Sequence, residues 1–246
     1  MRNEKGEKSV KRKKWWLSIF ALFVFLLSML SYSLAKDDGV KWRNLPKDNL
    51  LRQAELFKGN EELQRIFLFP EEEYDEGEAL KIAETINKLP HSLLVKTAES
   101  GVRIKLFDGD ITENQSAAKL KGKTPRGYLN KETTWDDVPG MGGSHTVLVK
   151  IGASEKGNGH GSVNLELHEL GHSIDNIVFN GIREDMDYLK IWGKEVDGLF
   201  PGITYFSNYP EEYFAETFAM FYVNNEQNQL LRQKAPETYN FIKQLD

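Results

Sequence analysis

One short stretch near the middle of the chain constrains its fold more than any other. Residues 168–172 read HELGH, and histidines four positions apart lie one above the other on one face of a helix. When residues 163–179 are projected at about 100° per residue, the opposite face is apolar. That apolar face consists of Val163, Leu167, Leu170, Ile174, Ile177 and Val178. The pattern predicts a helix that packs its back on a core and presents histidines at its front.

Histidines at this spacing can bind one metal ion. Two imidazoles four residues apart can both reach a zinc ion at about 2.1 Å. Glu169 points about 100° round the helix from His168, where it can act on the attacking water instead of binding the metal. The competing interpretation is a pair of exposed histidines beside an ordinary glutamate. We predict a zinc site with His168 and His172 as ligands and Glu169 as the catalytic base.

A catalytic zinc ion needs a third protein ligand, which this helix does not supply. A third histidine six residues after His172 would stand at position 178, which is a valine. The search moves to residues 208–222, NYPEEYFAETFAMFY, which have the composition of a helix. Glu212 suits the positively polarised first turn of that helix, so it already has a structural explanation. Glu216 lies one turn deeper and is flanked by alanines that allow close helix packing. We predict Glu216 as the third ligand, with Glu212 as its main rival.

The oxyanion that develops during peptide hydrolysis requires a hydrogen-bond donor besides the metal, and a tyrosine hydroxyl can supply it. Tyr205, Tyr209 and Tyr213 all lie close to the candidate ligands in the sequence. The residues alone do not choose among the three.

The N-terminus predicts export. Residues 1–14 carry seven Lys or Arg and two Glu, and residues 15–35 carry no charge. This order of a basic and an apolar segment is typical of a signal peptide or an N-terminal membrane anchor, and both remain open for residues 1–35. Ser33 and Ala35 supply the small residues of a cleavage site. We expect the protein outside the cell, either secreted or tethered to the outer face of the cytoplasmic membrane, with membrane contact only through an uncleaved N-terminus.

Composition excludes several classes of function. The chain has a net charge of −5 although its first 14 residues contribute +5, so the remainder carries −10. An acidic body argues against nucleic acid as a partner, since phosphate binding needs a basic surface. The chain contains no cysteine, which excludes disulfides, thiolate zinc ligands and cysteine nucleophiles. Nothing in the pattern suggests a coiled coil, so we expect a monomer.

The pattern of the whole chain predicts an α+β fold, with a small sheet followed by a mostly helical C-terminal half. Residues 36–60 are interpreted as a tether with a short helix, and residues 61–246 as the domain. The expected strands are 63–70, 102–107 and 146–152, and the expected helices are 75–89, 162–180, 184–197, 210–224 and 228–245. Residues 119–145 form a long irregular region, and such regions are often functional.

Three stretches together resemble a known family. They are TWDDVPGMGG (134–143), GHGSVNLELHELGHSIDNIV (159–178) and YPEEYFAETFA (209–219). They resemble the secreted Pro-Pro endopeptidases of Gram-positive bacteria and, more distantly, the catalytic domain of anthrax lethal factor. The resemblance runs from about residue 60 to the C-terminus.

The resemblance implies a zincin-like metallopeptidase fold with one catalytic Zn²⁺ on His168, His172 and Glu216. It also implies Glu169 as the base and Tyr209, seven residues before Glu216, as the oxyanion donor.

The resemblance further implies how a substrate binds. Residues 146–151 would be the edge strand to which an extended peptide adds. Val147 and Val149, within this strand, would then contact the peptide. The family has a Gly-Trp pair in the loop that shapes the proline pocket, whereas this chain has Gly127-Tyr128. Arg126 and Tyr128 are therefore candidate substrate contacts, and ordinary loop residues are the alternative.

These observations predict an extracellular zinc metalloendopeptidase that hydrolyses extended protein segments, with proline-rich segments as the candidate substrates. One alternative is a non-catalytic surface module that binds peptides in the same cleft or only holds zinc. The presence of Glu169 speaks against it, because binding alone requires no base. The other alternative is a toxin protease like lethal factor.

Overall fold

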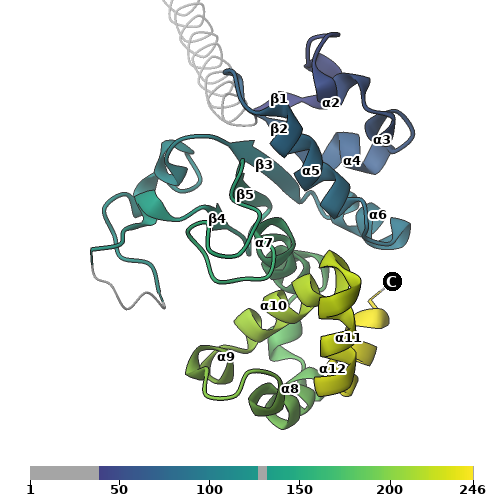
Figure 1. Cartoon of the computed structure of the whole chain (residues 1–246), viewed down its shortest axis with the longest axis vertical. Helices are drawn as coiled ribbons and strands as arrows, with labels where there is room; N and C mark the ends of the chain where they lie inside the picture. Colours follow the sequence, from purple (N-terminus) through teal and green to yellow (C-terminus); the bar gives the residue numbers. More distant parts are fainter. Residues whose placement is uncertain (1–38, 127–131, 246) are drawn as a thin grey trace, which may run out of the picture. The chain divides into compact units, whose positions relative to one another are not determined.

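A five-stranded sheet organises the N-terminal half of the part of the chain that the structure describes (Figure 1). The computed structural model describes residues 39–126 and 132–245. The strand order is β1-β2-β3-β5-β4, with β2, β3 and β5 parallel and the two outer strands antiparallel to their neighbours. The strands are Val40–Lys41 (β1), Phe67–Phe69 (β2), Arg103–Phe107 (β3), Gly140–Met141 (β4) and Thr146–Lys150 (β5).

Helices make up most of the C-terminal half, which confirms the α+β prediction. In Figure 1, α8 to α12 gather on the far side of α7 from the strands. The N-terminal helices are Leu50–Gln53 (α2), Glu55–Lys58 (α3), Glu61–Ile66 (α4), Glu76–Ile86 (α5) and His91–Glu99 (α6). The C-terminal helices are Leu165–Ser173 (α7), Met186–Leu199 (α8), Thr204–Asn208 (α9), Pro210–Val223 (α10), Asn225–Lys234 (α11) and Pro236–Lys243 (α12).

Local sequence signals explain where several helices begin and end. The carboxylate of Asp75 accepts the backbone N–H of Glu78 and thereby caps α5. The predicted helix 228–245 is two helices, because Pro236 has no N–H to continue α11 and instead begins α12. The predicted strand 63–70 is helical up to Ile66, and only the three residues of β2 are extended.

The domain begins earlier than the sequence suggested, so the part of the predicted tether that the structure describes is not a tether. Val40 pairs with Phe69 in the sheet, and the Trp42 indole donates to the carbonyl of Leu51 at 2.9 Å. Trp42, Leu51 and Phe57 are buried in the main core. The predicted signal or anchor, residues 1–35, lies outside the described residues. Among the described helices, none has the length and apolar character needed to span a bilayer.

Strand β5 is not an edge strand, contrary to the prediction for residues 146–151. It is flanked by β3 and β4, with Val147 opposite Ile104 and Val149 opposite Gly140. Val147, Leu148 and Val149 are all fully buried, as expected for a strand covered on both faces. The edge strand on this side of the sheet is β4.

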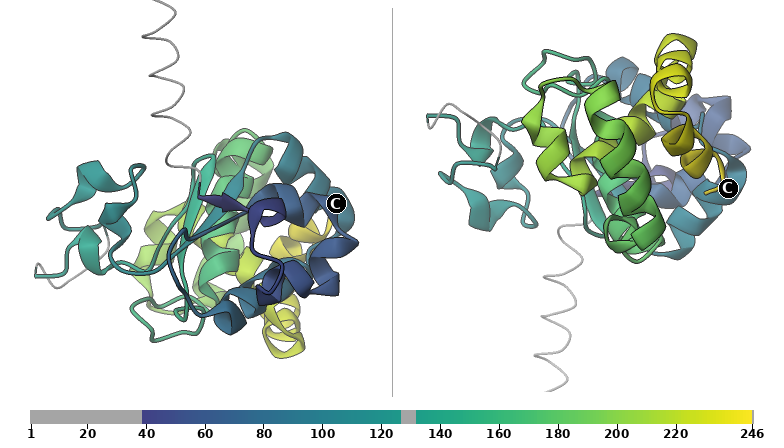
Figure 2. Two further views of the ribbon diagram at one scale, coloured as in Figure 1. Left: turned by 90° about the horizontal axis from the view of Figure 1, so that it is seen from above. Right: turned by 90° about the horizontal axis from the view of Figure 1, so that it is seen from below.

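The described residues between β3 and β4 extend away from the strands in every view (Figures 1 and 2). They contain 3₁₀ turns at Ile111–Glu113, Ala118–Leu120 and Trp135–Asp137. The irregular region predicted for 119–145 also contains a strand, β4, which was not predicted. A small separate cluster that includes Ile111 and Leu148 fixes the base of the segment between β3 and β4 to the sheet.

Candidate active site

Helix α7 carries the histidines as the projection predicted. Asn164 caps its first turn by accepting the N–H of Leu167 at 3.0 Å. The side chains of Leu167 and Leu170 are fully buried in the core, whereas His168 and His172 line a cleft of about 1030 Å³. The apolar back of the helix therefore fixes the direction in which the imidazoles point.

Two small residues bring α10 close to α7. A Cβ atom added to Gly171 would lie only 3.0 Å from the Cα of Ala215, so the helix backbones are nearly in contact. Such closeness is possible only with small residues at the crossing. It places the acidic side chains of α10 within reach of the imidazoles of α7.

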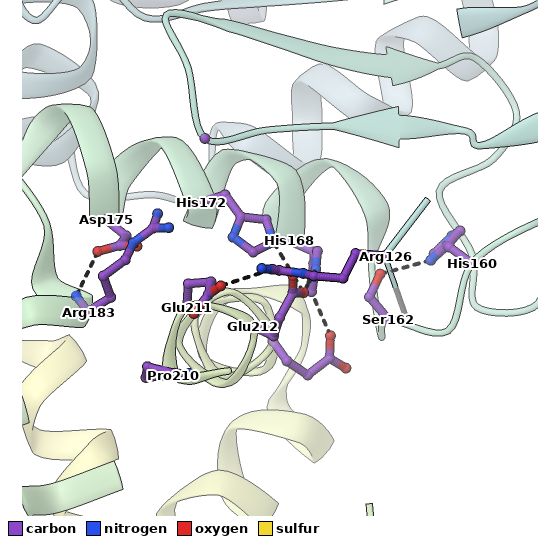
Figure 3. A network of polar contacts seen from close by, with 12 residues as sticks. Arg126, His160, Ser162, His168, His172, Asp175, Arg183, Pro210, Glu211 and Glu212 are labelled. Atoms are coloured by element: carbon purple, nitrogen blue, oxygen red, sulfur yellow. Dashed lines mark hydrogen bonds and ion pairs between the residues drawn. The ribbon is translucent and has the colours of Figure 1, made fainter. Parts of the chain in front are cut away.

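The carboxylate that meets both imidazoles belongs to Glu212 (Figure 3). Its Oε2 atom lies 3.5 Å from Nε2 of His168 and 3.4 Å from Nε2 of His172. One potential ligand atom from each of these three residues lies within 4.8 Å of the other two. Two imidazole nitrogens and one carboxylate oxygen are the donor set of catalytic zinc sites that keep a position open. The residues therefore fit a metal ion.

Glu216, the predicted third ligand, lies behind this group. Its Oε2 accepts a hydrogen bond from Nδ1 of His168 at 3.0 Å, and its Oε1 accepts the N–H of Val163 at 3.0 Å. One turn of α10 separates it from Glu212, so it reaches the far nitrogen of the ring. A carboxylate in this position selects the tautomer of a metal-binding histidine. The structure thus assigns the convergent position to the rival residue, Glu212, and a supporting position to Glu216.

Glu169 is placed as a catalytic base requires. Its side chain lines the cleft beside the histidines, and it accepts a hydrogen bond from the backbone N–H of Gly142. Burial raises the pKa of the Glu169 carboxyl, and the neighbouring histidines partly oppose this rise. A carboxylate with a raised pKa is the stronger proton acceptor near neutral pH.

Known proteins resemble this chain over most of its length. A family model described as "Anthrax toxin lethal factor, N- and C-terminal domain" matches residues 53–245. The Pro-Pro endopeptidase of Clostridioides difficile (strain 630) is 40% identical over 229 residues, which cover 93% of this chain and 96% of that protein. The Pro-Pro endopeptidase of Paenibacillus alvei is 39% identical over 183 residues, 74% of this chain and 84% of the relative.

A solved structure of the Paenibacillus alvei enzyme matches the fold with a TM-score of 0.71 and 38% identity. The match covers 75% of this chain and all of that structure. The chain belongs to the Pro-Pro endopeptidase family. The fold is therefore zincin-like, and the chain is a metalloendopeptidase, a hydrolase of peptide bonds that uses a metal and acts on a peptide or protein substrate.

In this member of the Pro-Pro endopeptidase family, one of the three candidate tyrosines faces the metal-binding group. Tyr205 lines the cleft, and burial together with a hydrogen bond to Glu212 raises the pKa of its hydroxyl. The ring of Tyr209 instead lies under the guanidinium of Arg126 at 4.2 Å, and the hydroxyl of Tyr213 is paired with Thr238 in the core. Tyr205 stands seven residues before Glu212, the same spacing that separates Tyr209 from Glu216.

Two glutamates, Glu212 and Glu216, dominate the electrostatics around His168. Burial alone would lower the pKa of His168, but hydrogen bonds with Glu212 and Glu216 outweigh this and raise it to about 10. Burial would raise the pKa of Glu212, whereas its contacts with His168 and His172 hold it well below the usual range. A metal ion that binds here must displace the proton that His168 holds, so binding depends on pH.

Arg126 lines the cleft, as expected for a substrate contact, and it also holds two carboxylates. One guanidinium nitrogen, Nη2, lies 2.9 Å from Glu211 Oε1 and 3.1 Å from Glu212 Oε1. Arg126 thereby binds Oε1 of Glu212, while Oε2 of the same carboxylate faces the histidines. Tyr128, the other predicted contact in this loop, lies outside the described residues.

The sequence reasoning missed one histidine of the cleft. His160 lines it, and its ring is fixed by the Ser162 hydroxyl at 2.8 Å and the Ala153 carbonyl at 2.7 Å. Burial lowers the pKa of this histidine, which favours the neutral ring. The signal was present in the glycine-rich turn before α7, where a histidine in a GHGS sequence has little reason to serve the core.

Proposed function

We propose that this chain is a zinc-dependent endopeptidase that hydrolyses the bond between consecutive prolines in extended segments of extracellular proteins. One observation carries the proposal: Nε2 of His168, Nε2 of His172 and Oε2 of Glu212 converge in a cleft that also contains Glu169. The names of the relatives supply the preference for proline.

The residues around this point of convergence then have separate roles. His168, His172 and Glu212 would hold the zinc ion, which when bound supplies a Lewis acid and lowers the pKa of water toward about 7. Glu169 takes a proton from the attacking water and passes it to the leaving amine. Tyr205 donates its hydroxyl hydrogen to the oxyanion that develops on the scissile carbonyl. Glu216 keeps His168 oriented through its Nδ1 atom.

Strand β4 is the surface to which an extended substrate would add. It ends the strand order of the sheet, so one side of its backbone has no strand partner within the described residues. Gly140 and Met141 both line the cleft, and the next residue, Gly142, contacts Glu169. A peptide paired with this edge would pass directly over the catalytic base. The role predicted for β5 is therefore proposed for β4.

We infer export from residues 1–35, where a basic segment precedes an uncharged apolar one. The protein then acts as a monomer outside the cell, secreted or tethered to the membrane by that segment. Its acidic body and the peptide-sized cleft agree with a protein substrate and not with nucleic acid.

A peptide library tests the proposal. Peptides that contain Pro-Pro at a fixed position and varied flanking residues are incubated with the zinc-loaded protein, and the products are identified by mass spectrometry. Cleavage between the prolines is the expected result. Bound zinc without cleavage of any peptide would favour the non-catalytic binding module.

The variant E169Q isolates the chemistry. It should keep one zinc per chain and lose activity by about 10² to 10⁴-fold, because the general base is gone. Glu226→Gln on α11, which removes an exposed carboxylate outside the cleft, serves as the control. Wild-type activity in a zinc-loaded E169Q protein would overturn the assignment.

A further inference from the structure

A buried aspartate fixes an arginine at the far end of the cleft. Asp175 is completely buried in the turn of π-helix Ile174–Val178 that follows α7. Its Oδ2 lies 2.5 Å from Nε of Arg183, and its Oδ1 accepts the backbone N–H of Arg183 at 2.9 Å. A guanidinium held in this way has a defined direction and little freedom left to lose when it binds a further group.

Arg183 lines the same cleft as the histidines and Glu169. Its side chain is 28% exposed, so the guanidinium is accessible from the cleft although its Nε atom is occupied. Figure 3 shows Asp175 and Arg183 on one side of the two histidines, and His160 on the opposite side. Arg183 therefore lies along the path of an extended substrate, at the His172 end.

Main-chain hydrogen bonds also hold this turn. Asp175 already holds the turn through the main chain, because its carboxylate accepts the N–H of Arg183 and its carbonyl accepts the N–H of Gly181 at 2.7 Å. Within the guanidinium of Arg183, the Nε–H donates to the carboxylate of Asp175. The two terminal NH₂ groups are donors that can serve a second carboxylate.

Another arginine of this cleft already serves two carboxylates. Arg126 contacts both Glu211 and Glu212 through a single nitrogen. Arg183 has one carboxylate partner, Asp175, among the described residues. A second carboxylate supplied by a substrate would complete the same arrangement.

We propose that Arg183 is a specificity-determining residue that binds an acidic side chain of the substrate, a few residues from the scissile bond on the His172 side of the site. This inference rests on the proposed function and adds a substrate class to it: Pro-Pro segments with Glu or Asp on one side. Guanidinium–carboxylate hydrogen bonds in a partly closed cleft are strong enough to favour Glu over the isosteric Gln by about tenfold.

Paired peptides test the inference on the zinc-loaded protein. Each pair carries the same Pro-Pro sequence and differs only by Glu or Gln at one position, moved stepwise from four residues before the scissile bond to four after it. The kcat/KM ratio of Glu to Gln peptide is measured for the wild type, for Arg183→Gln and for Lys190→Gln. Lys190 carries the same charge on α8, is exposed and does not line the cleft.

The wild type and K190Q should show a Glu preference of about tenfold on one side of the bond only, and R183Q should show a ratio near one. The variant R183Q leaves the carboxylate of Asp175 buried without its partner. If R183Q folds poorly for this reason, the kcat/KM ratio of Glu to Gln peptide is measured on the double variant D175N/R183Q, which also removes the charge of Asp175. A ratio of one at every position in the wild type, or a preference that survives in R183Q and in D175N/R183Q, would overturn the inference. Failure of the wild type to cut any Pro-Pro peptide would overturn the proposed function itself, which separates the two outcomes.

Discussion

Glu216 accepts a hydrogen bond from Nδ1 of His168, and this contact turns Nε2 of the same ring toward Glu212. The two glutamates stand four residues apart on α10 and therefore lie on one face of that helix. Glu216 contacts Nδ1 and Glu212 contacts Nε2 of the His168 ring, so their contributions to metal binding should differ in size.

The first prediction concerns this difference. Glu216→Gln should weaken zinc binding by about 10 to 100-fold, as is typical when a residue that orients a ligand is changed. Glu212→Gln should weaken it more, since it removes a charged donor from the metal itself. Competition with a chromogenic chelator at fixed pH measures both, with Glu211→Gln as the neighbouring control. The reverse order of E212Q and E216Q would restore Glu216 as the ligand.

The second prediction separates the tyrosines. Tyr205→Phe should lower kcat by about 10² to 10³-fold with little change in KM, because the hydroxyl acts on the oxyanion that exists only along the reaction path. Tyr209→Phe should leave both constants nearly unchanged, since the Tyr209 ring packs against Arg126 and its hydroxyl is not needed there. Steady-state kinetics on a Pro-Pro peptide measures the two variants, and a large loss of kcat in Y209F would contradict the assignment.

The third prediction concerns the contact between β4 and α7. A Cβ atom at Gly142 would lie 1.9 Å from the carbonyl oxygen of Glu169, so one of the two segments must move. Gly142→Ala should destabilise the protein by about 2 kcal/mol or more and misplace the base. Gly161→Ala is the matched control, because a Cβ there meets nothing within 4 Å. Thermal unfolding and kcat/KM measure both variants, and equal behaviour of G142A and G161A would contradict the proposed contact.

Periodicity was sufficient to predict the helix of the histidines. The apolar positions of α7 recur at helical spacing, and the same positions are buried in the structure. Elements α5 and β3 also followed from local pattern, because each carries a clear period and a clear boundary, whereas α6 and β4 were not predicted.

The choice between Glu212 and Glu216 could not be made from the sequence, because it depends on where α10 crosses α7. That crossing is set by the contact of Gly171 with Ala215, a tertiary feature with no local signature. The same holds for the edge strand. Strand β4 has two residues and a glycine-rich sequence, which gives no period to recognise, and the family resemblance implied the longer β5 as the edge.

The start of the domain was also missed, since residues 39–60 are polar on average although a few of their side chains are central to the core.

The fourth prediction concerns these residues. A chain that begins at residue 39 should fold and keep its activity, whereas a chain that begins at residue 61 should not fold stably. The shorter chain lacks β1 together with Trp42, Leu51 and Phe57, which are buried in the main core, and removal of one large buried aromatic side chain typically costs about 3 to 5 kcal/mol. Circular dichroism melts and limited proteolysis compare the two chains. Equal melting temperatures would show that residues 39–60 contribute nothing to the core, contrary to their packing.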